Sequence, residues 1–309
     1  MVCVDVHQHL WPEPLLAALA RRDEPPFIRR RGRRWVLSLT GEADWAFDPD
    51  RHDAHRRAAL LAGDGVDLAV VSLSSPLGIE SLPPDDAEEL MAAYHDGAAE
   101  LPRGLAAWAS AALTQPRPDL LAERLARGFV GLCLPAAALA TPEGWDRCGP
   151  LLAVLEAADA PLFVHPGPAP WAPVPASEPG LPDWWPAMTS YVSQMQAAWH
   201  AFHAIGRPRH PALRACFALL AGLAPLHDER LAARCGRAPL VDDRVFLDVS
   251  SYGRRAVEAV IDVVGLEQLV YGSDRPVVEP AALALGGPGD AALRAVNPAR
   301  LLDRTEVPA

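Results

Sequence analysis

Apolar residues along this chain gather in short runs that alternate with longer amphipathic stretches. Runs rich in aliphatic and β-branched residues, typical of buried strands, span residues 2–7, 66–74, 105–112, 129–134, 162–165, 213–220, 245–250 and 269–272. The stretches between them, such as RPDLLAERLARG and RRAVEAVIDVVG, repeat apolar residues at the i, i+3, i+4 spacing of a helix packed on one face. Eight such βα units predict a single domain over residues 1–309, an α/β fold of the closed (β/α)8 TIM barrel type. Its active site is expected at the carboxyl ends of the strands.

Two connections are too long to be simple turns. One follows the first strand over residues 10–56, and the other follows the fifth strand over residues 166–210. Long loops on the catalytic face of a barrel commonly form lids or substrate walls. The tryptophans in these loops fit either packing beneath a loop or an aromatic binding pocket. Trp11, just beyond the first strand, is the substrate-binding candidate among them.

Residue types that bind metals stand at the ends of three of the expected strands. His7 and His9 end the first apolar run two residues apart, so they share one face of a strand. His165 ends the run PLFVHPG, and Asp274 follows the last strand in QLVYGSDRP. Taken singly, a hydrogen-bonded rim histidine and a turn-capping aspartate are the simpler explanations. Together, four donors at one end of a barrel predict a divalent metal ion, zinc by preference, that keeps one position open for water.

The chain contains no lysine, so all 28 of its basic residues are arginines. This composition excludes Schiff-base chemistry and a lysine general base. It also excludes a carboxylated lysine as a bridge between two ions, which favours one metal over a pair.

The net charge of −11 argues against a nucleic-acid partner, because binding to phosphates needs a basic surface. The one basic run, residues 29–34, fits either a solvated hairpin or a clamp for an anionic substrate group.

Five cysteines without C-x-x-C spacing indicate buried thiols in a reducing compartment. With no signal peptide or membrane span in the pattern, we expect a cytoplasmic protein that binds a small molecule; a homodimer is left open.

Several motifs in order along nearly the whole chain carry a resemblance. They are DVHQHLWP, VHPGP, HPALRACFALLAGLAPLHDERL, VFLDVSSYG, LVYGSDRPV and NPARLL. Together they resemble the amidohydrolase-related family, the branch of the amidohydrolase superfamily with aminocarboxymuconate-semialdehyde decarboxylase and several aromatic-acid decarboxylases. The resemblance implies one divalent ion, zinc or manganese, held by the first-strand pair His7 and His9, by His165 and by Asp274. Asp274 would then be both a ligand and the catalytic proton carrier.

The chain departs from the family pattern after the sixth strand. There the family usually has a histidine followed by one residue and two glycines, whereas FALLAGLAP places Leu219 at the histidine and Ala221 at the first glycine. Other histidines could take over the missing role; the candidates are His200, His203, His210 and His227. Packing or surface positions are the simpler interpretation of these side chains.

We therefore expect a metal-dependent hydrolase that acts on a small carboxylated or cyclic substrate through a metal-activated water, with Asp274 as the base. The alternative is a non-oxidative decarboxylase of an aromatic or unsaturated acid, with Arg51 and Arg275 as candidate clamps for the substrate carboxylate. Structural salt bridges are the default interpretation of both arginines. A second alternative, based on Leu219, is a metal-free lactonase or a non-catalytic homologue.

Overall fold

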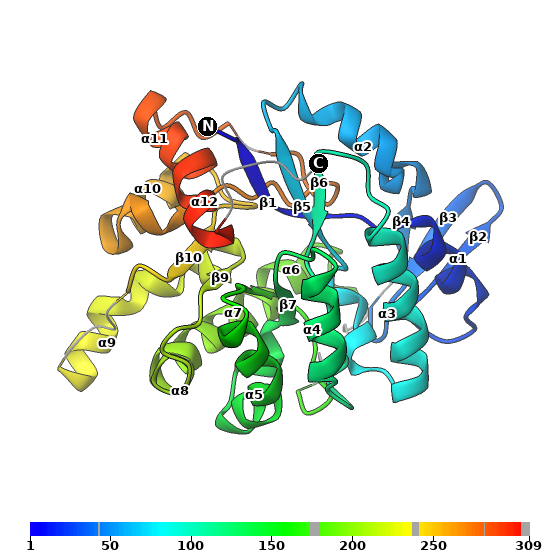
Figure 1. Ribbon diagram of the computed structural model, residues 1–309, viewed down its shortest axis with the longest axis horizontal. Helices are drawn as coiled ribbons and strands as arrows, with labels where there is room; N and C mark the ends of the chain where they lie inside the picture. Colours follow the sequence, from blue (N-terminus) through cyan, green and yellow to red (C-terminus); the bar gives the residue numbers. More distant parts are fainter. Residues whose placement is uncertain (43, 173–179, 237–240, 281, 304–309) are drawn as a thin grey trace.

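Eight short parallel strands form the centre of the molecule (Figure 1). The computed structural model describes residues 1–42, 44–172, 180–236, 241–280 and 282–303. The central strands are β1 (Val4–His9), β5 (Leu68–Ser72), β6 (Leu105–Ala107), β7 (Leu132–Pro135), β8 (Leu162–His165), β9 (Ala215–Phe217), β10 (Val245–Asp248) and β11 (Leu269–Val270). Every residue in them is buried, which explains why they are near-continuous apolar runs in the sequence.

The strands close into a barrel. Two ladders run in the orders β1-β5-β6 and β7-β8-β9-β10-β11. A parallel bridge between Ala109 and Leu132 joins β6 to β7. At the other seam, the Val6 amide donates to the Tyr271 carbonyl at 2.9 Å, and Gln8 bridges to Arg275. The (β/α)8 barrel expected from the sequence is confirmed, with each expected strand found and several of them shorter than the apolar run that predicted them.

Helices surround the barrel (Figure 1). In chain order they are α1 (Glu13–Arg21), α2 (Ala54–Leu61), α3 (Pro84–Ala98), α4 (Pro118–Ala126), α5 (Pro142–Ala157), α6 (Trp185–Met188), α7 (Ser190–Ala201), α8 (Arg207–Arg209), α9 (Asp228–Cys235), α10 (Arg254–Val264), α11 (Gly287–Ala291) and α12 (Asn297–Leu302). In α10 the buried residues Val257 and Val260 lie on the inner face, while the charged residues of RRAVEAVIDVV lie outside. Among the described residues, no helix is long and apolar enough to cross a membrane.

Aromatic side chains fill the barrel beneath its carboxyl-terminal end. The Trp108 ring is fully buried, donates from Nε1 to the Val6 carbonyl at 2.9 Å and stacks on Phe163 at 5.2 Å. A Cβ at Gly131 would lie 2.2 Å from the Pro161 carbonyl oxygen and 2.8 Å from the Trp108 ring, so only glycine fits between the neighbouring strand and the indole. The Phe163 ring lies 5.0 Å from that of His7, and this packed layer is therefore the floor of the histidine site.

The first long connection carries a small antiparallel sheet beside the barrel, made of β2 (Phe27–Arg31), β3 (Arg34–Ser38) and β4 (Trp45–Phe47) (Figure 1). We call it the wing. The basic run 29–34 forms its β2–β3 hairpin, with Gly32 in the left-handed turn. Arg29 pairs with Asp23 at 3.0 Å and Arg31 with Asp44 at 2.9 Å. These arginines are exposed, as the solvated-hairpin interpretation predicts.

The second long connection forms α6, α7, a π-helical turn (Phe202–Gly206) and α8. Residues 173–179 of its proline-rich start lie outside the described part of the chain. Helix α7 is tied to the loops that follow two strands. Gln194 accepts from the Gly167 amide at 2.9 Å, just after β8, and Gln196 donates to the Gly222 carbonyl at 2.8 Å, after β9. Helix α7 therefore crosses the carboxyl-terminal ends of these strands.

Candidate metal centre

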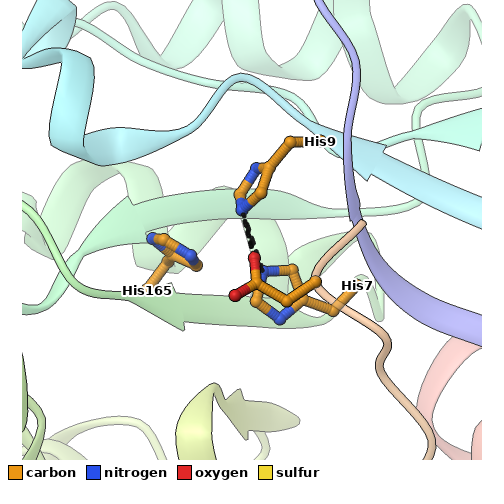
Figure 2. A group of neighbouring side chains, drawn as sticks. His7, His9 and His165 are labelled. Atoms are coloured by element: carbon orange, nitrogen blue, oxygen red, sulfur yellow. Dashed lines mark hydrogen bonds and ion pairs between the residues drawn. The ribbon is translucent and has the colours of Figure 1, made fainter. Parts of the chain in front are cut away.

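Four side chains converge at the carboxyl-terminal end of the barrel (Figure 2). His7 and His9 come from β1, His165 ends β8, and Asp274 follows β11. One ligand atom from each lies within 4.8 Å of those from the others. The Oδ1 atom of Asp274 is 3.0 Å from His9 Nε2 and 3.6 Å from His7 Nε2. Every residue of the cluster is at most 7% exposed. The structure thus brings together all four ligands predicted from the sequence.

Each imidazole is anchored through its Nδ1 atom, so that Nε2 faces the centre. The Nδ1 contacts are His7 to Asp248 Oδ2 at 2.8 Å, His9 to Ser72 Oγ at 2.9 Å and His165 to the Pro166 carbonyl at 2.9 Å. A carboxylate and a carbonyl only accept hydrogen bonds, which assigns the Nδ1 proton on His7 and His165. Ser72 also donates to the Gln8 carbonyl at 3.3 Å, which leaves its oxygen to accept from His9. The Nε2 lone pairs of all three rings are then free to bind an ion.

The donor set fits a divalent metal ion. His7 Nε2 and His9 Nε2 are only 3.1 Å apart, and two lone pairs that face each other repel unless a cation or a proton lies near them. The donor atoms of His7, His9 and Asp274 are 3.0–3.6 Å apart, which matches ligands placed about 2.1 Å from a common ion. Imidazole nitrogens with one carboxylate suit zinc and neighbouring transition metals rather than calcium or magnesium.

The charge states of the four groups follow from their surroundings. Burial lowers the pKa of both His9 and His165, which keeps these rings neutral and able to bind a metal. Burial acts the same way on His7, but the Asp248 carboxylate outweighs it and raises the pKa of His7 to about 9, so an ion that binds at His7 Nε2 must displace a proton from it. For Asp274, burial is outweighed by the neighbouring histidines, which hold its pKa at about 2. Asp274 is therefore a carboxylate at neutral pH.

The backbone of Asp274 adopts an uncommon conformation that directs its side chain inward. Its φ is +59°, in the left-handed region that costs a non-glycine residue of order 1–2 kcal/mol. The Asp274 amide donates to the His7 carbonyl at 2.8 Å, and Ser251 Oγ donates to Oδ2 at 3.3 Å. These bonds hold the carboxylate over β1 despite the strain.

Sequence reasoning missed Asp248, the partner of His7. The fully buried Asp248 ends β10, and its Oδ1 accepts from the Ser250 amide at 2.7 Å. The available signal was the run VFLD, in which a charged residue ends a wholly apolar strand. Such a carboxylate fixes the tautomer of a metal-bound histidine and increases its basicity.

Gly272 makes room for this pair, and replacing it should weaken metal binding. A Cβ at position 272 would lie 2.8 Å from His7 Cβ and 2.9 Å from Asp248 Cγ, so that the pair must move apart. We expect Gly272→Ala to weaken metal binding by about 10–100-fold, the range seen when a partner of a metal ligand is disturbed. Titration calorimetry with zinc measures the effect. Gly253→Ala is the matched control, because a Cβ there meets nothing within 4 Å. Equal affinity of the two variants would contradict the argument.

The three substrate-binding candidates lie in different surroundings. Trp11 is buried beside β1, and its ring packs against Phe47 at 5.3 Å and His52 at 4.5 Å, which also contact each other. Arg275 pairs with Asp64 at 3.0 Å and with Glu279 at 3.4 Å. Arg51 is about half exposed and lies 3.7 Å from Glu279. The arginines are thus held in ion pairs, and contact of any of the three residues with substrate stays a prediction.

Leu219 begins an unusual turn after β9. Strand register pairs Phe217 with both Val164 and Leu247, which places Leu219 one residue beyond the level of His165 and Asp248. From residue 219 to 223 every φ lies between +48° and +63°, and Gly222 is the only glycine among the five. Ala221 and Gly222, which stand where the resembled motif has two glycines, are therefore both left-handed, although alanine occupies the first position.

The nearby histidines do not enter the metal cluster. His203 packs against Trp199 at 4.4 Å and Phe202 at 5.2 Å. Burial lowers the pKa of His200, and the nearby His227 lowers it further. His210 pairs with Glu156 at 2.7 Å. In the described part of the chain, none of these contacts reaches a predicted ligand, so Leu219 has no histidine replacement within the cluster.

A second buried carboxyl group, Glu80, was also missed by sequence reasoning. It is 1% exposed, and its Oε1 accepts from Ser75 Oγ at 3.0 Å and from Ser110 Oγ at 3.3 Å. Oε2 has no hydrogen-bond partner among the described residues. Burial raises the pKa of Glu80 to about 7.

Glu80 should make folding stability depend on pH. The folded protein binds this proton more tightly than the unfolded chain, whose glutamates have a pKa near 4.5. As pH rises from below 5 to above 7, the free energy of unfolding of wild type should therefore fall by up to about 3 kcal/mol relative to that of Glu80→Gln. Urea unfolding of both proteins in a metal chelator, at pH 5 and at pH 8, measures the difference. If the difference in unfolding free energy between the two proteins is the same at pH 5 and pH 8, Glu80 is already ionised in the folded protein at pH 5.

Comparison with known proteins by sequence gives no match, either to protein-family models or to curated proteins. Solved structures do match along nearly the whole chain. IDCase from Metarhizium anisopliae has a TM-score of 0.75 and 20% identity, covering 98% of this chain and 97% of that one. 5-Carboxyvanillate decarboxylase from Sphingomonas paucimobilis has a TM-score of 0.73 and 18% identity, covering 98% of this chain and 99% of that one. A putative amidohydrolase from Staphylococcus aureus has a TM-score of 0.72 and 16% identity, covering 98% of this chain and 100% of that one. The chain therefore has the barrel fold of amidohydrolase-superfamily structures, as the motif resemblance predicts.

Proposed function

We propose that the protein is a metal-dependent, non-oxidative decarboxylase of the amidohydrolase superfamily that acts on a small aromatic or unsaturated acid. The observation that carries the proposal is the cluster of His7, His9, His165 and Asp274, with the Nε2 atoms of its anchored imidazoles turned inward. It lies at the carboxyl-terminal end of a barrel, where the active sites of this fold are found.

Decarboxylation is preferred over hydrolysis, which the sequence placed first, because of the structural neighbours. Besides the Sphingomonas enzyme, 2,6-dihydroxybenzoate decarboxylase from Rhizobium has this fold, with a TM-score of 0.68. The motif resemblance includes the same class of reaction. Hydrolysis stays the second candidate, favoured by Asp274, which is ionised at neutral pH and can therefore accept a proton from water.

In decarboxylation the bond from the ring carbon to the carboxylate breaks, carbon dioxide leaves and one proton takes its place on carbon. When bound, the divalent ion would supply Lewis-acid polarisation of the substrate's oxygen atoms. His7, His9 and His165 would hold it. Asp274 is the group in the cluster that can take up a proton and pass it to carbon. Ser251 donates a hydrogen bond to its Oδ2 atom and so helps to orient the carboxylate.

Zinc is our first choice for the ion, on the basis of the three imidazoles and one carboxylate. Manganese is the second choice. It is bound, together with a nitro-substituted hydroxybenzoic acid, in a structure of 5-carboxyvanillate decarboxylase from Novosphingobium aromaticivorans. Metal analysis of protein purified without added ions, followed by reconstitution with each metal, distinguishes the two ions from a metal-free protein.

The function is tested by measuring carbon dioxide release from a panel of hydroxylated benzoic acids and unsaturated dicarboxylic acids. Matched lactones and esters are assayed for hydrolysis in parallel, with zinc-loaded, manganese-loaded and chelator-treated protein. We expect metal-dependent carbon dioxide release from at least one acid. Metal-dependent hydrolysis without release of carbon dioxide would support the second candidate, and equal activity after chelation would overturn both.

A further inference from the structure

A cavity of about 140 Å³ lies outside the barrel, between the helices α3 and α4 (Figure 1). Its inner wall is the segment after β6, which contains Ser110 and Ala111. One face of α3 provides a second wall through Met91 and His95, which are one turn apart. Helix α4 contributes Arg124 to the lining. None of the lining residues is a ligand of the metal centre, so the cavity is separate from it.

Two buried donor groups at this cavity have no hydrogen-bond partner among the described residues. One is Nδ1 of His95, whose side chain belongs to a residue only 3% exposed, and the other is Nε of Arg124. Buried donors without a partner destabilise a fold and are therefore uncommon in native structures. Two of them at one cavity indicate a site for an acceptor that comes from outside the chain.

The neighbours of His95 determine which of its nitrogens carries the proton. The Ser110 amide donates to Nε2 at 3.1 Å, so Nε2 is an acceptor and the proton is on Nδ1. Burial, together with the charges of Arg124 and Arg127, lowers the pKa of His95 to about 3, which keeps the ring neutral. The Met91 carbonyl, one turn earlier in α3, acts on this pKa in the opposite direction but is not in hydrogen-bond geometry with Nδ1. His95 therefore has an N–H group left to donate.

Arg124 brings a positive charge without a counter-ion. In the described part of the chain it forms no ion pair, whereas its neighbours do: Arg117 pairs with Asp119 at 2.6 Å, and Arg127 with Asp96 at 3.6 Å. The Arg124 side chain is half-buried, so its charge is screened less than that of an exposed arginine. A cation beside a neutral N–H donor is an arrangement that binds an anion.

The rest of the lining determines what the anion carries. Met91, Ala111 and Leu121 are buried and apolar. The volume is close to the roughly 150 Å³ of an engineered apolar cavity that binds benzene. The one carboxylate among the lining residues, Glu88, is exposed at the rim, where water and salt screen its charge. A compact acid, with one ring and one carboxylate, therefore matches the cavity in size and in charge.

We propose that this cavity is a second binding site, separate from the metal centre, for a small monocarboxylic acid with a compact apolar body. Arg124 and the Nδ1–H group of His95 bind the carboxylate, and the apolar wall between α3 and α4 binds the ring. The site does not depend on the proposed function, because no metal ligand and no reacting group belongs to it. The acid should therefore bind to metal-free protein as well.

The test is the binding of 4-fluorobenzoate and of 4-fluorobenzamide to chelator-treated protein, measured by fluorine NMR titration. The usual binding efficiency of small ligands predicts a dissociation constant of about 10 mM or below for the acid. Arg124→Met should weaken binding of the acid by at least about tenfold, because a hydrogen bond between charged groups is lost. The neutral amide should bind to wild type at least about tenfold more weakly than the acid.

Arg127→Met is the matched control. It removes the same charge three residues later, but Arg127 does not line the cavity, so the affinity should change by less than about threefold. Ala92→Leu keeps the charge of Arg124 and fills the cavity from α3, and it should weaken binding by at least about tenfold. Ala92 is only half-buried and leucine favours a helix, so this variant should fold. Circular dichroism checks the fold of each protein.

Equal affinity of wild type and Arg124→Met for the acid would overturn the inference. An equal loss in Arg124→Met and Arg127→Met would do so too, because it would show only a long-range effect of charge. Binding that Ala92→Leu leaves unchanged would place the ligand elsewhere, and no saturation up to about 50 mM would show that the site does not exist. All these outcomes leave the proposed function unaffected, since the titration contains no metal and measures no turnover.

Discussion

Replacing His165 with alanine should remove the metal ion from the protein. The remaining ligands, His7, His9 and Asp274, all come from one side of the site, because β1 and the segment after β11 are neighbours at one seam of the barrel. His165 closes the opposite side from β8. Its loss should reduce affinity by more than about 100-fold, beyond the usual effect of disturbing a partner of a ligand. Metal analysis by mass spectrometry after dialysis measures the result.

His227→Ala is the control for this experiment. His227 is exposed on the turn after β9 and does not belong to the cluster, so this variant should keep one equivalent of metal. The ligand set proposed for the site would be wrong if His165→Ala also kept a full equivalent. Far-ultraviolet circular dichroism of both variants shows whether the barrel is intact.

The strands and the ligands could be predicted because both depend on local pattern. A strand buried on both faces leaves an apolar run of its own length, as PLFVH does for β8, whose bounds match the prediction. Residues two apart on a strand share a face, which was enough to place His7 beside His9. The strand predicted over residues 105–112 was wrong only in its length. Strand β6 ends at Ala107, but the residues that follow, Trp108 and Ala109, are fully buried and therefore also apolar.

The partners of the ligands could not be predicted, because they depend on contacts between distant parts of the chain. His7 and Asp248 are 241 residues apart, and His9 and Ser72 are 63 apart. Register around the closed barrel brings both pairs together. The side chain of Arg275 was another such case. Directly after a ligand it suggested a substrate clamp, yet Asp64, far away in sequence, pairs with it.

Replacing Asp274 with asparagine should abolish turnover while the protein still folds. The left-handed region at φ +59° tolerates asparagine better than most residues, so the backbone can keep its place over β1. Asparagine cannot take up and return a proton at neutral pH, and with Leu219 after β9 no sixth-strand histidine is present to do so. Loss of a general acid or base lowers the rate by about 10²–10⁴-fold, and we expect the upper part of that range.

The measurement is kcat on the best substrate of the panel at saturating metal, with metal content determined for each sample. Ser251→Ala is the matched variant, because it removes only the hydrogen bond to Asp274 Oδ2 and should reduce kcat by less than about tenfold. His200→Ala, His203→Ala and His227→Ala should each change kcat by less than about threefold, since they lie outside the cluster. A loss of a hundredfold in one of these three, or more than a tenth of wild-type activity in metal-loaded Asp274→Asn, would assign the proton transfer to another residue. The expected pattern, a large loss at Asp274 alone, would mean that one carboxylate serves as both ligand and proton carrier in a site that lacks the family's sixth-strand histidine.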